Sequence, residues 1–250
     1  MAMADPTLTQ SRAPPHKLWA WLVHLFTATG VVWSLLALLA VIDERWTEAL
    51  LWLLLALIVD GVDGSLARAA RVKEQAPRID GDVLDLVIDF LGYVFVPTVF
   101  MWRAEMLPEP LFVPLAALIL VSSLYVFARR DMKTPDGYFR GFPALWNVVA
   151  LYVFVTGIGP YAAAGVVLVL AILSFAPVLV VHPFRVRDFG PWLLVATAVW
   201  TASTAALLVP ALAGVVRSGL LMVSSTTSFL LLAMGLWRTA RGPAVLPPPA

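Results

Sequence analysis

The chain has 250 residues, of which 61% are hydrophobic and 13% are charged, and its formal net charge is +1. A soluble domain of this length needs far more polar surface. The near-neutral charge, without a separate basic block, argues against nucleic-acid binding. The chain has no cysteine, which excludes disulfides, thiolate metal sites and thiol nucleophiles. The composition therefore indicates an integral membrane protein.

The chain is predicted to be an all-α, polytopic membrane protein with a single domain at 18–237. Residues 1–17 are polar and contain proline, and 238–250 end in "GPAVLPPPA", so both are predicted to be flexible tails. The domain contains eight segments close to the ~20 residues of a membrane span. They are 18–42, 48–70, 82–102, 110–128, 141–157, 160–181, 191–210 and 214–237.

The first segment and the junction between the fifth and sixth segments allow two further predictions. The first segment is too long for a signal-peptide core and lacks a clear cleavage site, so it is predicted to be a retained membrane anchor. The motif "GIGPY" at 157–161 predicts a tight turn between the fifth and sixth helices.

The distribution of basic residues predicts the orientation in the membrane. If the N-terminus is cytoplasmic, only Arg45, Arg103 and Arg217 of the 17 lysines and arginines fall on the outer side. Cytoplasmic loops of membrane proteins are enriched in these residues. The pattern therefore favours an even number of spans, with both termini in the cytoplasm.

Four acidic residues interrupt the second and third predicted spans. Asp60 and Asp63 lie in "VDGVDGSLAR" at the end of one span, and Asp85 and Asp89 lie in "GDVLDLVID" at the start of the next. Each pair shares a helix face. In an antiparallel hairpin, with a rise of ~1.5 Å per residue, the two pairs reach matching depths. Asp63 is then expected opposite Asp85, and Asp60 opposite Asp89.

Such a group of carboxylates would be self-repelling unless cations lay between them. Ligation by oxygen alone suits Mn²⁺ or Mg²⁺, here predicted as a pair of ions. Gly61 and Gly64 clear space beside the acids, either for a phosphate or for close helix packing. Arg68, one turn further on, is a permanently charged donor that could clamp a phosphate. Together these features favour an enzyme of phosphoryl-type transfer.

The hairpin resembles the CDP-alcohol phosphotransferase signature D-x2-D-G-x2-A-R … G-x3-D-x3-D. The matching residues are Asp60, Asp63, Gly64, Ala67, Arg68, Gly81, Asp85 and Asp89. The resemblance implies that all four aspartates bind the metal ions and that Asp89 is also the general base. It further implies that Gly64, Ala67, Arg68 and Gly81 contact the CDP-lipid.

The loop between Arg68 and Gly81, residues 69–80, is longer than is usual in the family. Together with "MKTPDGYFRGFPALWN" and "VVHPFRVR", it resembles the branch of the family whose acceptor is choline. This closer resemblance implies transfer of a phosphatidyl group from CDP-diacylglycerol to choline, with release of CMP. It places the protein in the bacterial inner membrane, with an active site open to the cytoplasm. Members of the family are commonly homodimers.

A quaternary ammonium group cannot donate N–H hydrogen bonds and favours aromatic faces. Tyr93 lies one turn past Asp89, Tyr125 and Trp146 flank the next cytoplasmic segment, and all three are candidate choline contacts. Aromatic residues in membrane helices also serve packing or the interfacial belt. Asn147 is a candidate site ligand or an interhelical hydrogen-bonding residue.

Other functions share parts of this pattern. Enzymes of the phosphatidylserine or phosphatidylglycerol-phosphate type use the same hairpin with another acceptor, and a phosphorylated acceptor would need further basic residues. Membrane prenyltransferases also bind diphosphate lipids through acidic residues, but in two well-separated motifs. A cation-coupled transporter would place its carboxylates near mid-membrane between repeats, and this sequence contains no repeat.

Overall fold

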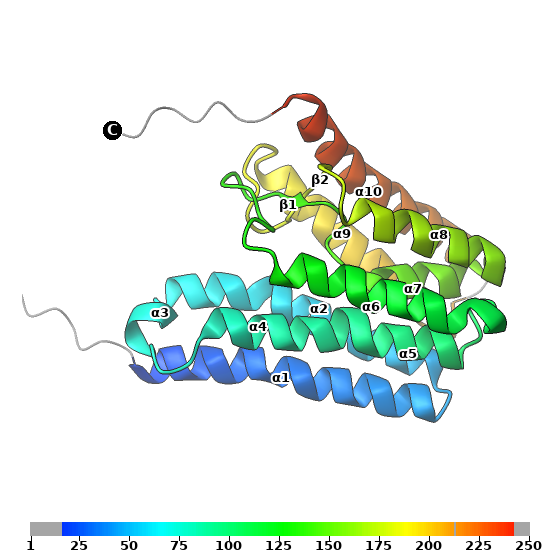
Figure 1. The fold of residues 1–250 in the computed structure, drawn as a ribbon, viewed down its shortest axis with the longest axis horizontal. Helices are drawn as coiled ribbons and strands as arrows, with labels where there is room; N and C mark the ends of the chain where they lie inside the picture. The colour runs from blue at the N-terminus through cyan, green and yellow to red at the C-terminus, as the bar shows by residue number, and fades with distance from the viewer. Residues whose placement is uncertain (1–16, 213, 243–250) are drawn as a thin grey trace, which may run out of the picture.

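The structure, a computed structural model, describes residues 17–212 and 214–242 (Figure 1). Its helices are α1 (Lys17–Ile42), α2 (Trp46–Ala69), α3 (Val72–Gln75), α4 (Gly81–Asp89), α5 (Val96–Arg103), α6 (Phe112–Ala128), α7 (Trp146–Thr156), α8 (Pro160–Leu173), α9 (Pro191–Leu207) and α10 (Gly214–Ala240). A π-helix, η1 (Phe90–Phe95), joins α4 to α5, and a 3₁₀ helix, η2 (Glu109–Leu111), precedes α6. The two short strands are β1 (Phe139–Arg140) and β2 (Leu179–Val180). The fold is thus almost entirely helical.

Five helical stretches are long and apolar enough to cross a membrane. They are Lys17–Ile42, Trp46–Ala69, Gly81–Arg103, Glu109–Ala128 and Gly214–Ala240. The helices α7, α8 and α9 have 11, 14 and 17 residues. The chain is therefore an all-α multi-pass membrane protein, and each predicted segment corresponds to a helix. The number of crossings stays a prediction.

The fifth and sixth helices are shorter than the sequence predicted. Helix α7 begins at Trp146 rather than at 141, after Pro143 and after Ala144, which has a positive φ of 57°. Helix α8 ends at Leu173, and Pro177 then precedes β2. Proline lacks the N–H that continues a helix, and the residue before it avoids helical angles.

The predicted turn at 157–161 is confirmed. Gly157 ends α7 with φ of 63°, and Pro160 occupies the first turn of α8. Glycine adopts this left-handed conformation without steric cost, and proline is pre-organised to begin a helix. At the other end of the chain, α10 continues to Ala240, three residues into the tail predicted from 238. The rest of that tail, from 243, and residues 1–16 lie outside the described residues.

The core lies where α1, α2, α5, α6, α7 and α8 pack together (Figure 1). Its largest fully buried side chains include Leu50, Phe100, Ile119 and Trp146. Helices α9 and α10 pack against each other, and β2 also contacts α10. Because lipid offers little hydrophobic gain between helices, close packing of this kind is what holds a membrane bundle together.

The long loop 69–80 contains a short helix of its own. After Arg71, whose φ is 47°, α3 places Val72 and Ala76 against Ala20 and Val23 of α1. Asp80 then caps α4, since its side chain accepts hydrogen bonds from two backbone N–H groups of the first turn. The residues that lengthen this loop therefore anchor the hairpin to α1.

Two segments from the second half of the chain, 129–145 and 178–190, form a small cap. Strand β1 pairs with β2 in antiparallel fashion, Phe139 opposite Val180. Behind the strands, Tyr138, Val181 and Val186 pack with Leu193 of α9 in a separate buried cluster. Phe184 of the second segment packs against Gly61 of α2, so the cap lies over α2.

Candidate active site

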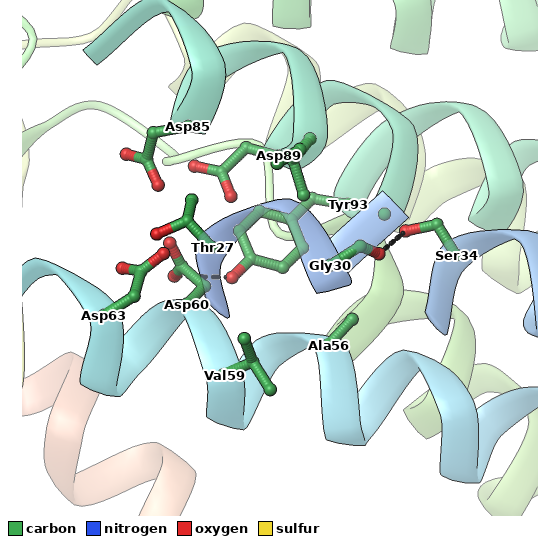
Figure 2. Close-up of a pocket in the computed structure, with 12 residues that line it drawn as sticks. Thr27, Gly30, Ser34, Ala56, Val59, Asp60, Asp63, Asp85, Asp89 and Tyr93 are labelled. Atoms are coloured by element: carbon green, nitrogen blue, oxygen red, sulfur yellow. Dashed lines mark hydrogen bonds between the residues drawn. The ribbon is translucent and has the colours of Figure 1, made fainter. Parts of the chain in front are cut away.

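The acidic hairpin forms a carboxylate cluster inside the bundle. Asp60 of α2 and Asp85 and Asp89 of α4 each bring one oxygen within 4.8 Å of the others. Figure 2 shows the acids of α4 facing those of α2 across a cavity. Asp63 is only 4% exposed and lines the same cavity, but it is not part of the group of three. The shared depth predicted for the acids is thus found, with Asp63 at the edge of the cluster.

Tyr93 lies at the base of this cluster. Its hydroxyl donates a 2.6 Å hydrogen bond to Asp60 Oδ2 (Figure 2), and the residue is 5% exposed. It belongs to the π-helix η1, which begins directly after Asp89. Single π-turns inside α-helices are frequent at functional sites, because they re-aim the side chains that follow. Of the three candidate choline contacts and the candidate site ligand Asn147, Tyr93 is the one that lines the cavity, and its hydroxyl is hydrogen-bonded to Asp60.

Helix α1 supplies a wall of the cavity that the sequence interpretation missed. Thr27, Gly30 and Ser34 line it beside the acids. A Cβ on Gly30 would lie 2.5 Å from Ile88 Cγ2, so the glycine allows α1 to approach α4 closely. Small and polar residues at i, i+3 and i+7 in an otherwise apolar span are a signal that could have revealed this face.

The two glycines beside the acids of α2, Gly61 and Gly64, have different surroundings. A Cβ on Gly61 would lie 2.7 Å from the ring of Phe184, so Gly61 admits the cap segment. A Cβ on Gly64 would meet only Arg68 Nη1, at 3.5 Å. Gly61 therefore serves packing, whereas Gly64 faces open space. Arg68 is exposed and donates a 2.9 Å hydrogen bond to Ser65 Oγ.

The remaining residues of the motif lie where the hairpin meets α1. Ala67 packs beside the buried cluster formed with α1 and α3. A Cβ on Gly81 would lie 3.2 Å from His24 Cε1, so this glycine brings the start of α4 close to α1. Both residues position the hairpin at this end of the site.

Basic residues of the cap lie near the acids, and the sequence interpretation gave Lys133 and Arg185 no role in the site. Burial and the nearby Arg185 lower the pKa of Lys133, while Asp85, Asp60 and Asp89 act in the opposite direction. Burial, with Lys133, Arg185 and Arg68, lowers the pKa of His182 to about 3. Cations around a buried imidazole disfavour its charged form. His182 is therefore neutral at physiological pH.

The other two candidate choline contacts and Asn147 lie elsewhere. Trp146 is fully buried and donates a 2.8 Å hydrogen bond to Ser123 Oγ. Asn147 is 4% exposed, and its side-chain oxygen accepts the backbone N–H of the next residue. Tyr125 is 43% exposed and packs against Phe175, with ring centroids 4.7 Å apart. None of these three is among the residues that line the cavity.

The donor set of the cluster fits a divalent cation. Three carboxylate groups converge within 4.8 Å, and oxygen ligands are those that Mg²⁺ and Mn²⁺ prefer. Within the described parts of the chain, no lysine, arginine or histidine forms an ion pair with any of the three. Unneutralised acids inside a membrane protein are costly, and a bound cation would offset this cost.

The fold and the site define a multi-pass membrane protein with the hairpin of the CDP-alcohol phosphotransferases. No family model matches the chain. Phosphatidylcholine synthase of Pseudomonas aeruginosa is 47% identical over 232 residues, which cover 92% of this chain and 96% of the relative. The chain belongs to the phosphatidylcholine synthase family.

Further relatives carry the same name. Phosphatidylcholine synthase of Mesorhizobium japonicum is 42% identical over 73% of this chain and 68% of the relative. The enzyme of Agrobacterium fabrum is 39% identical over 76% of this chain and 79% of the relative. Among the classes that the sequence left open, this membership identifies a phospholipid-synthesising transferase rather than a prenyltransferase or a transporter.

Proposed function

We propose that this chain transfers the phosphatidyl group of CDP-diacylglycerol to choline and releases CMP. The observation that carries the proposal is the cluster of Asp60, Asp85 and Asp89, in a chain that is 47% identical to a phosphatidylcholine synthase over nearly its whole length. The four aspartates of the signature thus line one cavity. The name of the relatives supports choline over serine or glycerol phosphate as acceptor.

We further propose that the cluster holds a pair of divalent ions, Mn²⁺ or Mg²⁺. Asp60, Asp85 and Asp89 would be ligands, with Asp63 at the edge of the same cavity. When bound, the ions supply positive charge that neutralises the phosphate oxygens. Tyr93 holds Asp60 in place through its hydrogen bond, as supporting residues do for metal ligands.

In the proposed reaction, Asp89 takes the proton of the choline hydroxyl. The hydroxyl oxygen forms a bond to the phosphatidyl phosphorus, and the bond from that phosphorus to the CMP oxygen breaks. The open space at Gly64 lets the diphosphate approach the helix backbone. Arg68 donates N–H groups to its oxygens, since a guanidinium can contact a phosphate through two parallel hydrogen bonds.

The proposed location is the bacterial inner membrane, with the site open to the cytoplasm and both termini on that side. The excess of basic residues in alternate loops supports this orientation. Homodimerisation, common in the family, is part of the proposal and can be measured by the mass of the purified protein in detergent.

The acceptor can be tested directly. Purified protein in detergent would receive CDP-diacylglycerol and Mn²⁺ with labelled choline, serine or glycerol 3-phosphate. We expect labelled lipid and CMP with choline. Lipid product with serine and none with choline would overturn the proposed acceptor.

The role of the acids needs a matched pair of variants. Asp89→Asn should abolish turnover, whereas Asp82→Asn, an exposed acid of the same helix that pairs with Lys73, should not. Mn²⁺ binding, measured by calorimetry without substrate, should weaken in Asp85→Asn and not in Asp82→Asn. Turnover retained in Asp89→Asn would refute its role as base, and Mn²⁺ affinity unchanged in Asp85→Asn would refute the metal site.

A further inference from the structure

Three cations from distant parts of the sequence gather around His182 of the cap. Arg68 lies in the last turn of α2, while Lys133 and Arg185 belong to the two cap segments. All three act on His182, whose pKa they lower together with burial. Lys133 is also near enough to Asp60, Asp85 and Asp89 for these acids to act on its pKa. The three cations therefore lie near His182, and Lys133 also lies near the acids of the proposed metal site.

The acids of the surrounding loops are engaged elsewhere. Asp131 pairs with Arg129 at 2.8 Å, Asp136 pairs with Arg238 at 2.8 Å, and Asp82 pairs with Lys73 at 2.6 Å. The carboxylate of Asp188 accepts a 2.7 Å hydrogen bond from the buried Tyr138.

As a result, no carboxylate in the described segments lies within ion-pairing distance of Arg68, Lys133 or Arg185. Lys133 is partly buried, so its ammonium group loses hydration, and no carboxylate forms an ion pair with it to offset this loss. An anion bound between the three cations would offset it.

The fold holds the cations in this arrangement. The Lys133 ammonium lies 5.1 Å from the centre of the Phe139 ring, a cation–π distance. The Phe139 ring in turn stacks on His182, with centroids 5.0 Å apart and an interplanar angle of 2°. Phe184 packs against Gly61 of α2 and so places the segment that carries Arg185 over the motif. The positions are thus built by packing and do not depend on a flexible surface.

We propose that Lys133 and Arg185 complete, with Arg68, a subsite for the phosphate of CMP, the leaving group of the proposed reaction. This inference rests on the proposed function. The acids would hold the metal ions, and the three cations would contact the phosphate that leaves with CMP. When the bond from the phosphatidyl phosphorus to the bridging oxygen breaks, its electron pair stays on that oxygen, which leaves with CMP. Charge-assisted hydrogen bonds from the three cations stabilise the negative charge on the departing phosphate.

The experiment compares the binding of CMP and of cytidine. Calorimetry on purified protein in detergent with Mn²⁺ should show that Lys133→Gln and Arg185→Gln each weaken CMP about 10-fold, as expected for losing one charge-assisted hydrogen bond. Cytidine, which lacks the phosphate, should bind these variants as it binds the wild type. Lys133→Arg should retain most of the CMP affinity. Arg187→Gln, an exposed charge in the same segment, should leave it unchanged.

The outcomes separate this inference from the proposed function. If the wild type makes phosphatidylcholine but both variants keep its CMP affinity, the subsite is refuted. The subsite is also refuted if the variants lose as much affinity for cytidine as for CMP, because cytidine has no phosphate. It is refuted as well if Arg187→Gln loses as much CMP affinity as Lys133→Gln and Arg185→Gln. A wild type without turnover and without CMP binding would overturn the proposed function and this inference with it. Arg185 is exposed, so its substitution tests the subsite even if Lys133→Gln unfolds.

Discussion

Removal of one hydroxyl group, in Tyr93→Phe, tests how the carboxylate cluster is supported. The hydroxyl donates a 2.6 Å hydrogen bond to Asp60 Oδ2, a length typical of a charge-assisted O–H···O⁻ bond. Hydrogen bonds to ionised groups contribute ~1.5–3 kcal/mol, and about 1.4 kcal/mol corresponds to a factor of ten. Residues that support metal ligands typically affect metal affinity or activity by about 10- to 100-fold.

We therefore expect Tyr93→Phe to lower turnover by roughly 10- to 100-fold and to raise the Mn²⁺ concentration needed for half-maximal rate. The ring is retained, so the buried packing at this position, which is 5% exposed, does not lose volume. The assay is incorporation of labelled choline into lipid across a Mn²⁺ titration.

The matched control is Tyr152→Phe. Tyr152 is partly buried, and its hydroxyl forms hydrogen bonds with Ser224 Oγ at 2.6 Å and Ser228 Oγ at 2.8 Å. These bonds join α7 to α10, so the control should lower the unfolding temperature without changing the Mn²⁺ dependence. Wild-type turnover and Mn²⁺ dependence in Tyr93→Phe would refute the reasoning. A raised KM for choline alone would instead identify Tyr93 as a choline contact.

Three further predictions concern packing and pH. Gly64→Ala should leave the unfolding temperature unchanged, because its Cβ would meet only Arg68 Nη1 at 3.5 Å, but it should raise the KM for CDP-diacylglycerol by filling space proposed for the diphosphate. Gly235→Ala should destabilise the protein by ~1–3 kcal/mol, because its Cβ would clash with the backbone oxygen of Leu179. Stability should also fall as the pH drops from about 6.5 toward 3, because His182 is protonated in the unfolded chain but stays neutral in the folded protein. In His182→Gln, the unfolding temperature should depend less on pH over this range.

These predictions have simple controls. Gly219→Ala places a Cβ in open space on the same helix as Gly235, so it should change neither stability nor KM. An unaltered KM in Gly64→Ala would contradict the proposed diphosphate position. An unfolding temperature like that of the wild type in Gly235→Ala would contradict the close packing of α10 on β2. If the unfolding temperature of His182→Gln depends on pH as strongly as that of the wild type, groups other than His182 determine the loss of stability in acid.

The sequence was informative wherever structure depends on neighbouring residues. Apolar runs predicted the helices because a membrane requires every backbone group to bond within its own segment. The turn at Gly157 and Pro160 followed from the backbone preferences of those residues. Regular spacing in α2 and α4 put the acids of each helix on one face, and short connections made the two helices neighbours.

The lengths of α7 and α8 were less predictable. Composition alone cannot show where an apolar helix ends when the next residues are also apolar, as they are after Leu173. There the end depends on Pro177 and on pairing of β2 with β1, which lies more than thirty residues earlier in the chain.

By itself, then, the sequence determined that this is a helical membrane protein with an acidic hairpin and which residues form the signature. Only the tertiary structure decided which side chains meet. It brought Thr27 of α1 to the cavity and Lys133 of the cap near the acids, and it placed Trp146 in the core instead. The reason is physical: helix periodicity is set within a few residues, whereas contacts between helices and loops depend on close approaches, such as that of Phe184 to Gly61, that no local pattern encodes.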